Sequence, residues 1–102
     1  MSPICQLFRQ AVLLRKQITC TYRQSYRELC PHVLGHTRGQ EKALTYQFAG
    51  QSSSGLPPRG EWRCLFLVDV HNVEIRNGAW DTGSSHTRTQ VCVEVVDVDV
   101  NR

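Results

Sequence analysis

The sequence lacks any long apolar run. Nowhere do its 102 residues approach the roughly 18 consecutive apolar residues that a membrane-spanning helix requires. The apolar run nearest the N-terminus, residues 11–14, lies between Arg9 and Arg15 and is too short for a signal peptide. We therefore expect a cytoplasmic protein with no membrane partner.

Signatures of extreme composition are also missing. With 40% hydrophobic and 21% charged residues, the composition excludes a disordered, collagen-like or fibrous chain. A chain of this length can bury one hydrophobic core and has little room for a second. We expect a single domain over residues 1–102.

The sequence has no Cys-x-x-Cys motif, and its five cysteines are an odd number. They stand at positions 5, 20, 30, 64 and 92, mostly beside apolar or β-branched residues. Because free cysteine behaves as a small hydrophobe, we expect five buried thiols and no disulfide framework.

Motifs for catalysis are absent as well. No serine lies in a nucleophile elbow, and the Ser-rich segment lacks the phosphate-binding pattern Gly-x-x-x-x-Gly-Lys-Ser. Cys30, His32 and His36 share a predicted strand face, but the sequence offers no clear fourth zinc ligand. We expect no enzyme, no metal and no cofactor.

Charge is distributed unevenly along the chain. Residues 1–51 hold seven Lys and Arg against two Glu, a net charge of +5, and residues 52–102 hold five against seven, a net charge of −2. The basic first half suits phosphates or acidic partners. Solvated faces that merely differ in charge are the alternative interpretation.

Periodicity predicts one helix followed by strands. Residues 3–16 repeat apolar positions at intervals of three and four, with Ser2 as the N-cap and Pro3 in the first turn. Alternating segments then predict strands. Pro31 indicates an edge or a bend. The expected strands cover residues 17–22, 26–38, 42–49, 61–68, 73–76 and 91–100, with a loop at 50–60.

The last of these strands changes phase. Val91, Val93 and Val95 share one parity, whereas Val96, Val98 and Val100 share the other, so a bulge or a break is expected near 95–96. One helix and several short strands with hairpin connections predict a mainly β fold, a small antiparallel β-barrel with an N-terminal α-helix.

The order of these parts resembles a known family. An apolar strand ends in Tyr22, and Arg27 and Pro31 follow; a hairpin then leads to a strand ending in Tyr46. The element Arg-x-Leu-x-Leu begins at Arg63. Residues 17–77 therefore resemble the WYL domain, an SH3/Sm-like β-barrel of bacterial regulators, and residues 78–102 form a C-terminal extension with one or two strands.

The resemblance implies a non-enzymatic, ligand-sensing or transcription-regulating module that binds single-stranded nucleic acid or a small anionic ligand. Arg offers a planar fork for phosphate or carboxylate, and Tyr or His can stack on a base. Such domains are usually fused to a helix-turn-helix, so a separate DNA-binding protein is a candidate partner. The inherited ligand-binding positions are Tyr22, Arg27, His32, Tyr46 and Arg63, and Arg23 and Arg38 would extend the basic patch.

Two alternatives stay open. The arginines can instead pair with Glu28, Glu61 or Asp69 and serve only to stabilise the barrel. The valine-rich C-terminal strand can pair with another chain by strand addition, which would make the protein an interaction or homo-oligomerisation module.

Overall fold

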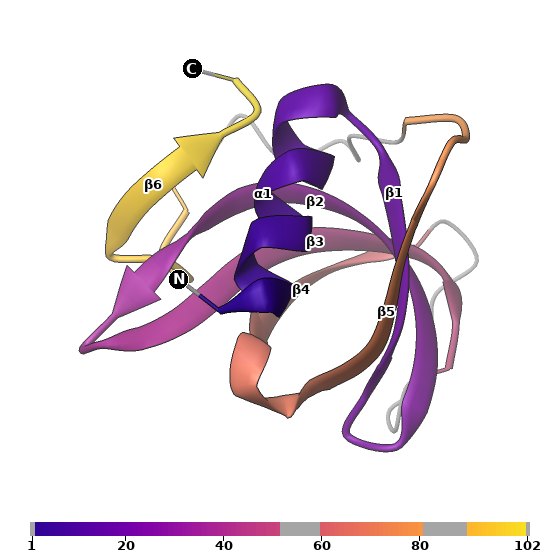
Figure 1. The fold of residues 1–102 in the computed structure, drawn as a ribbon, viewed down its shortest axis with the longest axis horizontal. Coiled ribbons are helices and arrows are strands. Elements are labelled where there is room, and N and C mark those ends of the chain that lie inside the picture. Colours follow the sequence, from indigo (N-terminus) through magenta and orange to yellow (C-terminus); the bar gives the residue numbers. More distant parts are fainter. Residues whose placement is uncertain (1, 52–59, 81–89, 102) are drawn as a thin grey trace.

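The computed structural model describes residues 2–51, 60–80 and 90–101. One helix precedes a mainly antiparallel arrangement of strands, as the sequence predicts (Figure 1). The elements are α1 (Pro3–Leu14), β1 (Gln17–Tyr22), β2 (Ser25–Thr37), β3 (Gln40–Gly50), β4 (Glu61–Phe66), the 3-10 helix η1 (Leu67–Asp69), β5 (Val70–Arg76) and β6 (Val95–Asp99).

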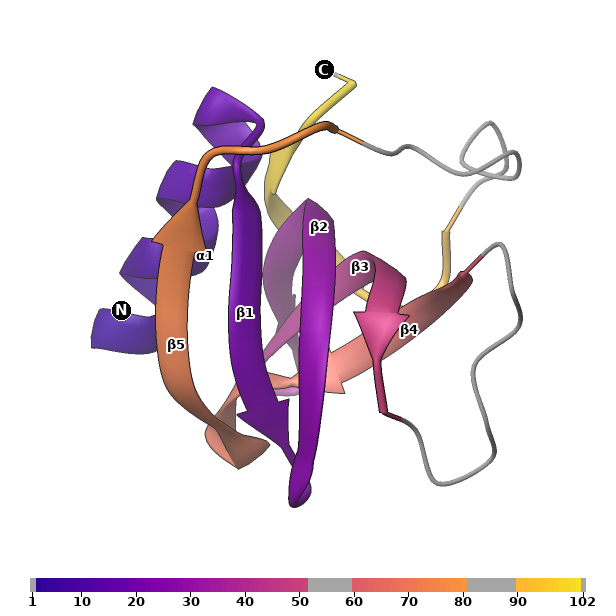
Figure 2. The ribbon, with the colours of Figure 1, turned by 90° about the vertical axis from the view of Figure 1, so that its right-hand side faces the viewer.

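Five of the strands form one continuous antiparallel sheet in the order β4-β3-β2-β1-β5, and Figure 2 shows them side by side. Between β1 and β2 the turn residues Arg23 and Gln24 both have positive φ, of 48° and 71°. A two-residue hairpin turn with both central residues left-handed matches the twist of the strands. This turn carries Arg23 at the tip of the hairpin.

Strand β2 is the centre of the fold. Along one edge it pairs with β3, and along the other it pairs first with β1, up to Leu29, and then with β6, from Val33 onward. Pro31 lies in the gap between these two partners, where its missing N–H costs no hydrogen bond to either. The predicted bend is confirmed: the register with β3 shifts between Pro31 and Val33.

Helix α1 begins as expected and ends two residues early. The Ser2 hydroxyl accepts a hydrogen bond from the Cys5 amide at 3.1 Å, which satisfies one of the free N–H groups of the first turn. Arg15, with φ of 52°, ends the helix in a left-handed cap. The buried face is Cys5, Phe8, Ala11 and Val12, so Leu14, which the periodicity placed inward, is exposed instead.

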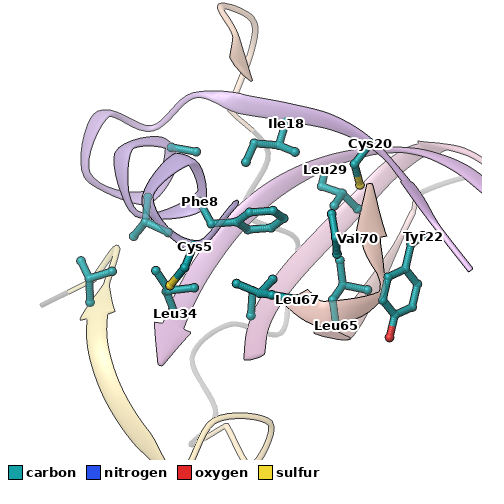
Figure 3. Close-up of a cluster of buried hydrophobic side chains, with 14 residues drawn as sticks. Cys5, Phe8, Ile18, Cys20, Tyr22, Leu29, Leu34, Leu65, Leu67 and Val70 are labelled. Atoms are coloured by element: carbon teal, nitrogen blue, oxygen red, sulfur yellow. The ribbon is translucent and has the colours of Figure 1, made fainter. Parts of the chain in front are cut away.

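The helix packs over the concave side of the sheet and supplies the middle of the core. Phe8 is fully buried and points between the strands, among Ile18, Leu29 and Leu34 (Figure 3). Tyr22 lies at the far end of this cluster, with its hydroxyl at the margin (Figure 3). A second small cluster of Val33, Cys92 and Val93 packs with Leu44.

The described strands do not close into a barrel by hydrogen bonding. The sheet ends at β4 on one side and at β5 on the other, and these two described strands are joined by η1 without pairing with each other. The predicted strand 61–68 stops at Phe66 because the chain turns there, and β5 starts earlier than expected, at Val70. The mainly β class with an N-terminal helix is confirmed, and among the described strands β4 pairs along one edge only.

The phase change in the C-terminal valines corresponds to a bulge. Leu34 pairs with Val98 and Gly35 with Val96, so Asp97 is the extra residue, slightly beyond the predicted position. Residues 90–94 lie outside the strand, so β6 is shorter than the expected 91–100.

The expectation of five free thiols is wrong for two of them. Cys64 in β4 and Cys92 form a disulfide across 28 residues of sequence, with Cα atoms 5.6 Å apart. Sequence neighbours did not reveal this pair, because the two residues meet only when the C-terminal segment folds back along the sheet. Cys5, Cys20 and Cys30 are free and buried, as expected.

Among the described residues, no helix is long and apolar enough to cross a membrane. Residues 52–59, which include most of the predicted loop and its serines, lie outside the described residues.

Candidate anion-binding site

Three of the predicted ligand-binding residues meet at one pocket. Tyr22, Arg27 and Arg63 line a cavity of about 410 Å³ between the β1–β2 hairpin and strand β4. Arg23, the predicted extension of the patch, also lines it. Among the described residues, the lining is Tyr22, Arg23, Ser25, Arg27, Trp62, Arg63, Cys64, Leu65 and Phe66, which include three arginines and no carboxylate.

Arg27 is buried at this site, with only 7% of its surface exposed. Alternation along β2 turns its side chain inward, like that of Leu29 two residues on. Its neighbour across the sheet is Gly50, where a Cβ would lie 2.7 Å from the Arg27 Cα, so glycine is needed for the two strands to approach. The close approach of β2 and β3 beside Arg27 therefore depends on Gly50.

One polar side chain holds the Arg27 guanidinium in place. Arg27 Nη1 donates a hydrogen bond to Gln47 Oε1 at 3.2 Å, and Gln47 is itself fully buried. Gln47 Nε2 in turn donates to the carbonyls of Ala49 and Gln51. The amide orientation is thus fixed, with its oxygen facing the guanidinium.

Aromatic rings flank the cations. The Arg27 guanidinium carbon lies 5.0 Å from the centre of the Tyr22 ring, and that of Arg23 lies 5.1 Å from it. The Tyr22 hydroxyl accepts a hydrogen bond from the Phe66 amide at 3.2 Å, which joins the hairpin to β4. Cation–π contacts stabilise the two arginines but supply no negative charge.

The nearby carboxylates pair with other arginines. Asp69 binds Arg23 at 3.2 Å, Glu61 binds Arg63 at 2.8 Å, and Glu28 binds Arg76. No carboxylate of the described residues forms an ion pair with Arg27, and its Nε has no hydrogen-bond partner there. The structural alternative considered above thus applies to Arg63 and Arg23 but not to Arg27.

The electrostatics of the pocket follow from this arrangement. Burial, and then the positive charge of Arg63, lower the pKa of the Arg27 guanidinium from its usual value. Taking a charged group out of water costs several kcal/mol unless an opposite charge is provided. An anion in the pocket would provide that charge, shared between Arg27 and Arg63.

Two other predicted residues lie away from the pocket. His32 is fully buried, with Nδ1 2.7 Å from the carbonyl oxygen of Cys30. Its ring lies 4.8 Å from that of Trp62 and 4.9 Å from that of Trp80. Tyr46 is also buried and meets Trp62 edge-on at 5.2 Å. These rings form an internal aromatic cluster, so His32 and Tyr46 do not present a stacking surface.

His32 is enclosed because β2 is buried on both faces. One face packs on the core, and the indoles of Trp62 and Trp80 cover His32 on the other. Alternation in the sequence distinguishes a covered face from a solvated one only when a single face is buried.

Arg38, the other residue predicted to extend the basic patch, lies at the turn between β2 and β3. It is exposed and is not among the residues that line the pocket.

Sequence reasoning missed four contributors to the site. Gln47 orients Arg27, Trp62 and Phe66 supply apolar walls, and Cys64 belongs to the strand that forms one side. Gln47 carried a usable signal, since it is a polar residue at a strand position between two aromatic residues, Tyr46 and Phe48. The role of Cys64 depends on tertiary structure alone.

A second pocket, of about 550 Å³, lies between the start of α1, the β2–β3 turn and η1. Its one carboxylate, Glu41, already accepts hydrogen bonds from the Ser2 hydroxyl and amide. No group of three or more potential metal ligands occurs in residues 2–51, 60–80 and 90–101. The arginine pocket is therefore the better candidate for a binding site.

No protein-family model matches the chain, and neither a curated protein nor a solved structure does.

Proposed function

We propose that this protein is a non-enzymatic binding module that recognises a small anionic group in the arginine pocket. The observation that carries the proposal is Arg27, a buried guanidinium that no described carboxylate neutralises. Retaining an unpaired buried cation costs stability, so a ligand that supplies the missing charge is the simplest reason for keeping it.

The chemistry of the pocket favours a carboxylate or a phosphate. Arg27 and Arg63 can both donate in-plane N–H groups to such oxygens. The resemblance to WYL domains supports the same class of ligand. Single-stranded nucleic acid is less well supported, because His32 and Tyr46, the rings proposed to stack on bases, are buried.

Titration calorimetry with inorganic phosphate tests the proposal. We expect saturable binding to the unmodified protein and about a tenfold or greater loss of affinity in Arg27→Gln, the effect of one charge-assisted contact. The matched control is Arg9→Gln, which removes an exposed arginine of α1 and should leave binding unchanged. Equal weakening by both variants would mean that phosphate responds only to net charge.

The alternative role of the C-terminal strand is less favoured by the geometry. Strand β6 pairs with β2 of the same chain, over Val33–His36, so one of its edges is already occupied. A role in assembly remains a separate proposal, for which sedimentation of the protein with and without residues 91–102 is the direct test.

A further inference from the structure

The arginine pocket coincides with the outer edge of a strand. Strand β4 is at one end of the sheet and pairs only with β3 among the described strands. The pocket lining contains five consecutive β4 residues, from Trp62 to Phe66. Side chains of adjacent residues point to opposite faces, so an unbroken run indicates that the pocket runs along the main chain of the strand.

The direction of the main-chain groups of β4 follows from one hydrogen bond. The Phe66 amide donates to the Tyr22 hydroxyl, so it points away from β3 and toward the hairpin. The pairing of β3 with β4 is regular, without a register shift. Since the direction of N–H and C=O alternates along an antiparallel strand, Cys64 also directs its N–H and C=O outward. A donor and an acceptor of the main chain therefore face the pocket.

The alternation of side chains along β4 also determines on which face Arg63 lies. Arg63 and Leu65 share one face of β4, the face of the core, and Cys64 lies on the other. Arg27 is buried on the core side, where its pKa responds to the charge of Arg63. A strand added beside β4 would thus direct every second side chain toward these two arginines.

We propose that the natural ligand is an extended acidic peptide segment of a partner protein, which adds to the outer edge of β4 in antiparallel orientation. Its main chain pairs with Cys64, and an acidic side chain opposite Arg63 or Leu65 reaches Arg27. This inference rests on the anion-binding function proposed above and names the class of ligand. Strand addition supplies affinity through the main chain and specificity through alternate side chains.

The complementarity of charge selects this occupant. The described lining holds three arginines and no carboxylate. Arg23 and Arg63 pair with Asp69 and Glu61, but no described carboxylate pairs with Arg27, whose charge attracts an acidic segment and repels a basic one. A phosphate or a nucleic acid backbone would satisfy the arginines but would leave the Cys64 N–H and C=O to water. A peptide has both a donor and an acceptor for them.

The test uses the blocked pentapeptide Val-Glu-Val-Glu-Val and two N-methylated forms of it. In an antiparallel pair, the residue opposite Cys64 exchanges both hydrogen bonds with it and points to the Cys64 face. The glutamates must point to the opposite face to reach Arg27. The peptide residue opposite Cys64 is therefore a valine. We expect N-methylation of the three valines to reduce affinity about tenfold or more, and N-methylation of the two glutamates to have little effect.

Two further measurements identify the contacts. Hydrogen exchange of the Cys64 amide should slow when the peptide binds, and it should not slow with inorganic phosphate. Replacing both glutamates of the peptide by glutamine should weaken binding to the unmodified protein, and Arg27→Gln should weaken binding of the acidic peptide in the same way. Arg9→Gln serves as the control.

The outcomes separate this inference from the proposed function. If phosphate binds through Arg27 but the two N-methylated peptides bind equally, or a single-stranded oligonucleotide binds more tightly than the peptide, strand addition is wrong and the anion site stands. If neither phosphate nor the peptide binds, both proposals fall. Weaker binding on N-methylation of the glutamates alone would also overturn the proposed register.

Discussion

Arg27 donates a hydrogen bond to Gln47, a neutral side chain, although the carboxylate of Glu28 is next to it in the sequence. Glu28 points to the opposite face of β2 and pairs with Arg76. The strand therefore separates a cation from the nearest available carboxylate. Gln47 fixes the guanidinium in position but leaves its charge for a ligand.

The first prediction concerns the stability cost of this charge. Arg27→Met keeps a long, unbranched side chain but removes the buried cation. In phosphate-free buffer we expect the free energy of unfolding to stay the same or rise by about 1–2 kcal/mol, as when buried ions are replaced by apolar groups. Urea unfolding measures it. A loss of more than about 2 kcal/mol would show that Arg27 stabilises the fold itself.

The same variant links stability to the ligand. Any ligand that binds only the folded state raises the melting temperature with its concentration. Phosphate should therefore raise the melting temperature of the unmodified protein and of Arg9→Gln, but not that of Arg27→Met. Differential scanning fluorimetry at constant ionic strength makes this comparison.

The helix and the strands could be predicted from the sequence because each depends on local pattern, whereas Arg27 and Arg63 were singled out by the resemblance to a family. Ser2 caps α1 through a neighbour three residues away, and Arg27 lies at the start of β2, where Arg27 and Leu29 are buried and Tyr26 is exposed. The predicted place of His32 on a ligand surface was wrong because β2 is covered on both faces, which no local pattern indicates. The disulfide between Cys64 and Cys92 was not predicted because it joins segments that meet only after folding.

The second prediction concerns the docking of β6. A Cβ on Gly35 would lie 1.9 Å from the carbonyl oxygen of Val95, so the two strands approach closely only because residue 35 is glycine. Gly35→Ala should displace β6 and cost about 1–3 kcal/mol, as overpacking does. Gly39→Ala is the control, because a Cβ there meets no atom within 4 Å and only its φ of 80° opposes the change.

Hydrogen exchange distinguishes local from global effects in Gly35→Ala. Amides of Val96 and Val98 should exchange faster, whereas those of β1 should be protected as before. Unchanged protection in β6 would mean that the strand does not depend on close approach at Gly35.

The third prediction concerns the disulfide, which ties β4 to the segment leading into β6. A cross-link over 28 residues of sequence removes unfolded-state entropy worth about 3–4 kcal/mol in the chain-entropy model. The double variant Cys64→Ser/Cys92→Ser should lose about this much. Adding a reductant should lower the stability of the unmodified protein but not that of the variant. Equal stability with and without reductant in the unmodified protein would contradict the cross-link.

The last prediction concerns acid and the start of α1. Burial alone would raise the pKa of Glu41, but its hydrogen bonds from Ser2 outweigh burial and lower the pKa below the ordinary value of 4.5. A carboxylate with a lowered pKa in the folded state adds stability that is complete above its unfolded pKa. That contribution is lost as the pH falls through the folded-state pKa. Glu41→Gln should therefore lower stability by about 1 kcal/mol at pH 7 and by less at pH 3, because glutamine resembles the protonated acid. Urea unfolding at both pH values, with Glu74→Gln as an exposed control, decides the matter. The same deficit at both values would mean that Ser2 does not depend on the charge of Glu41.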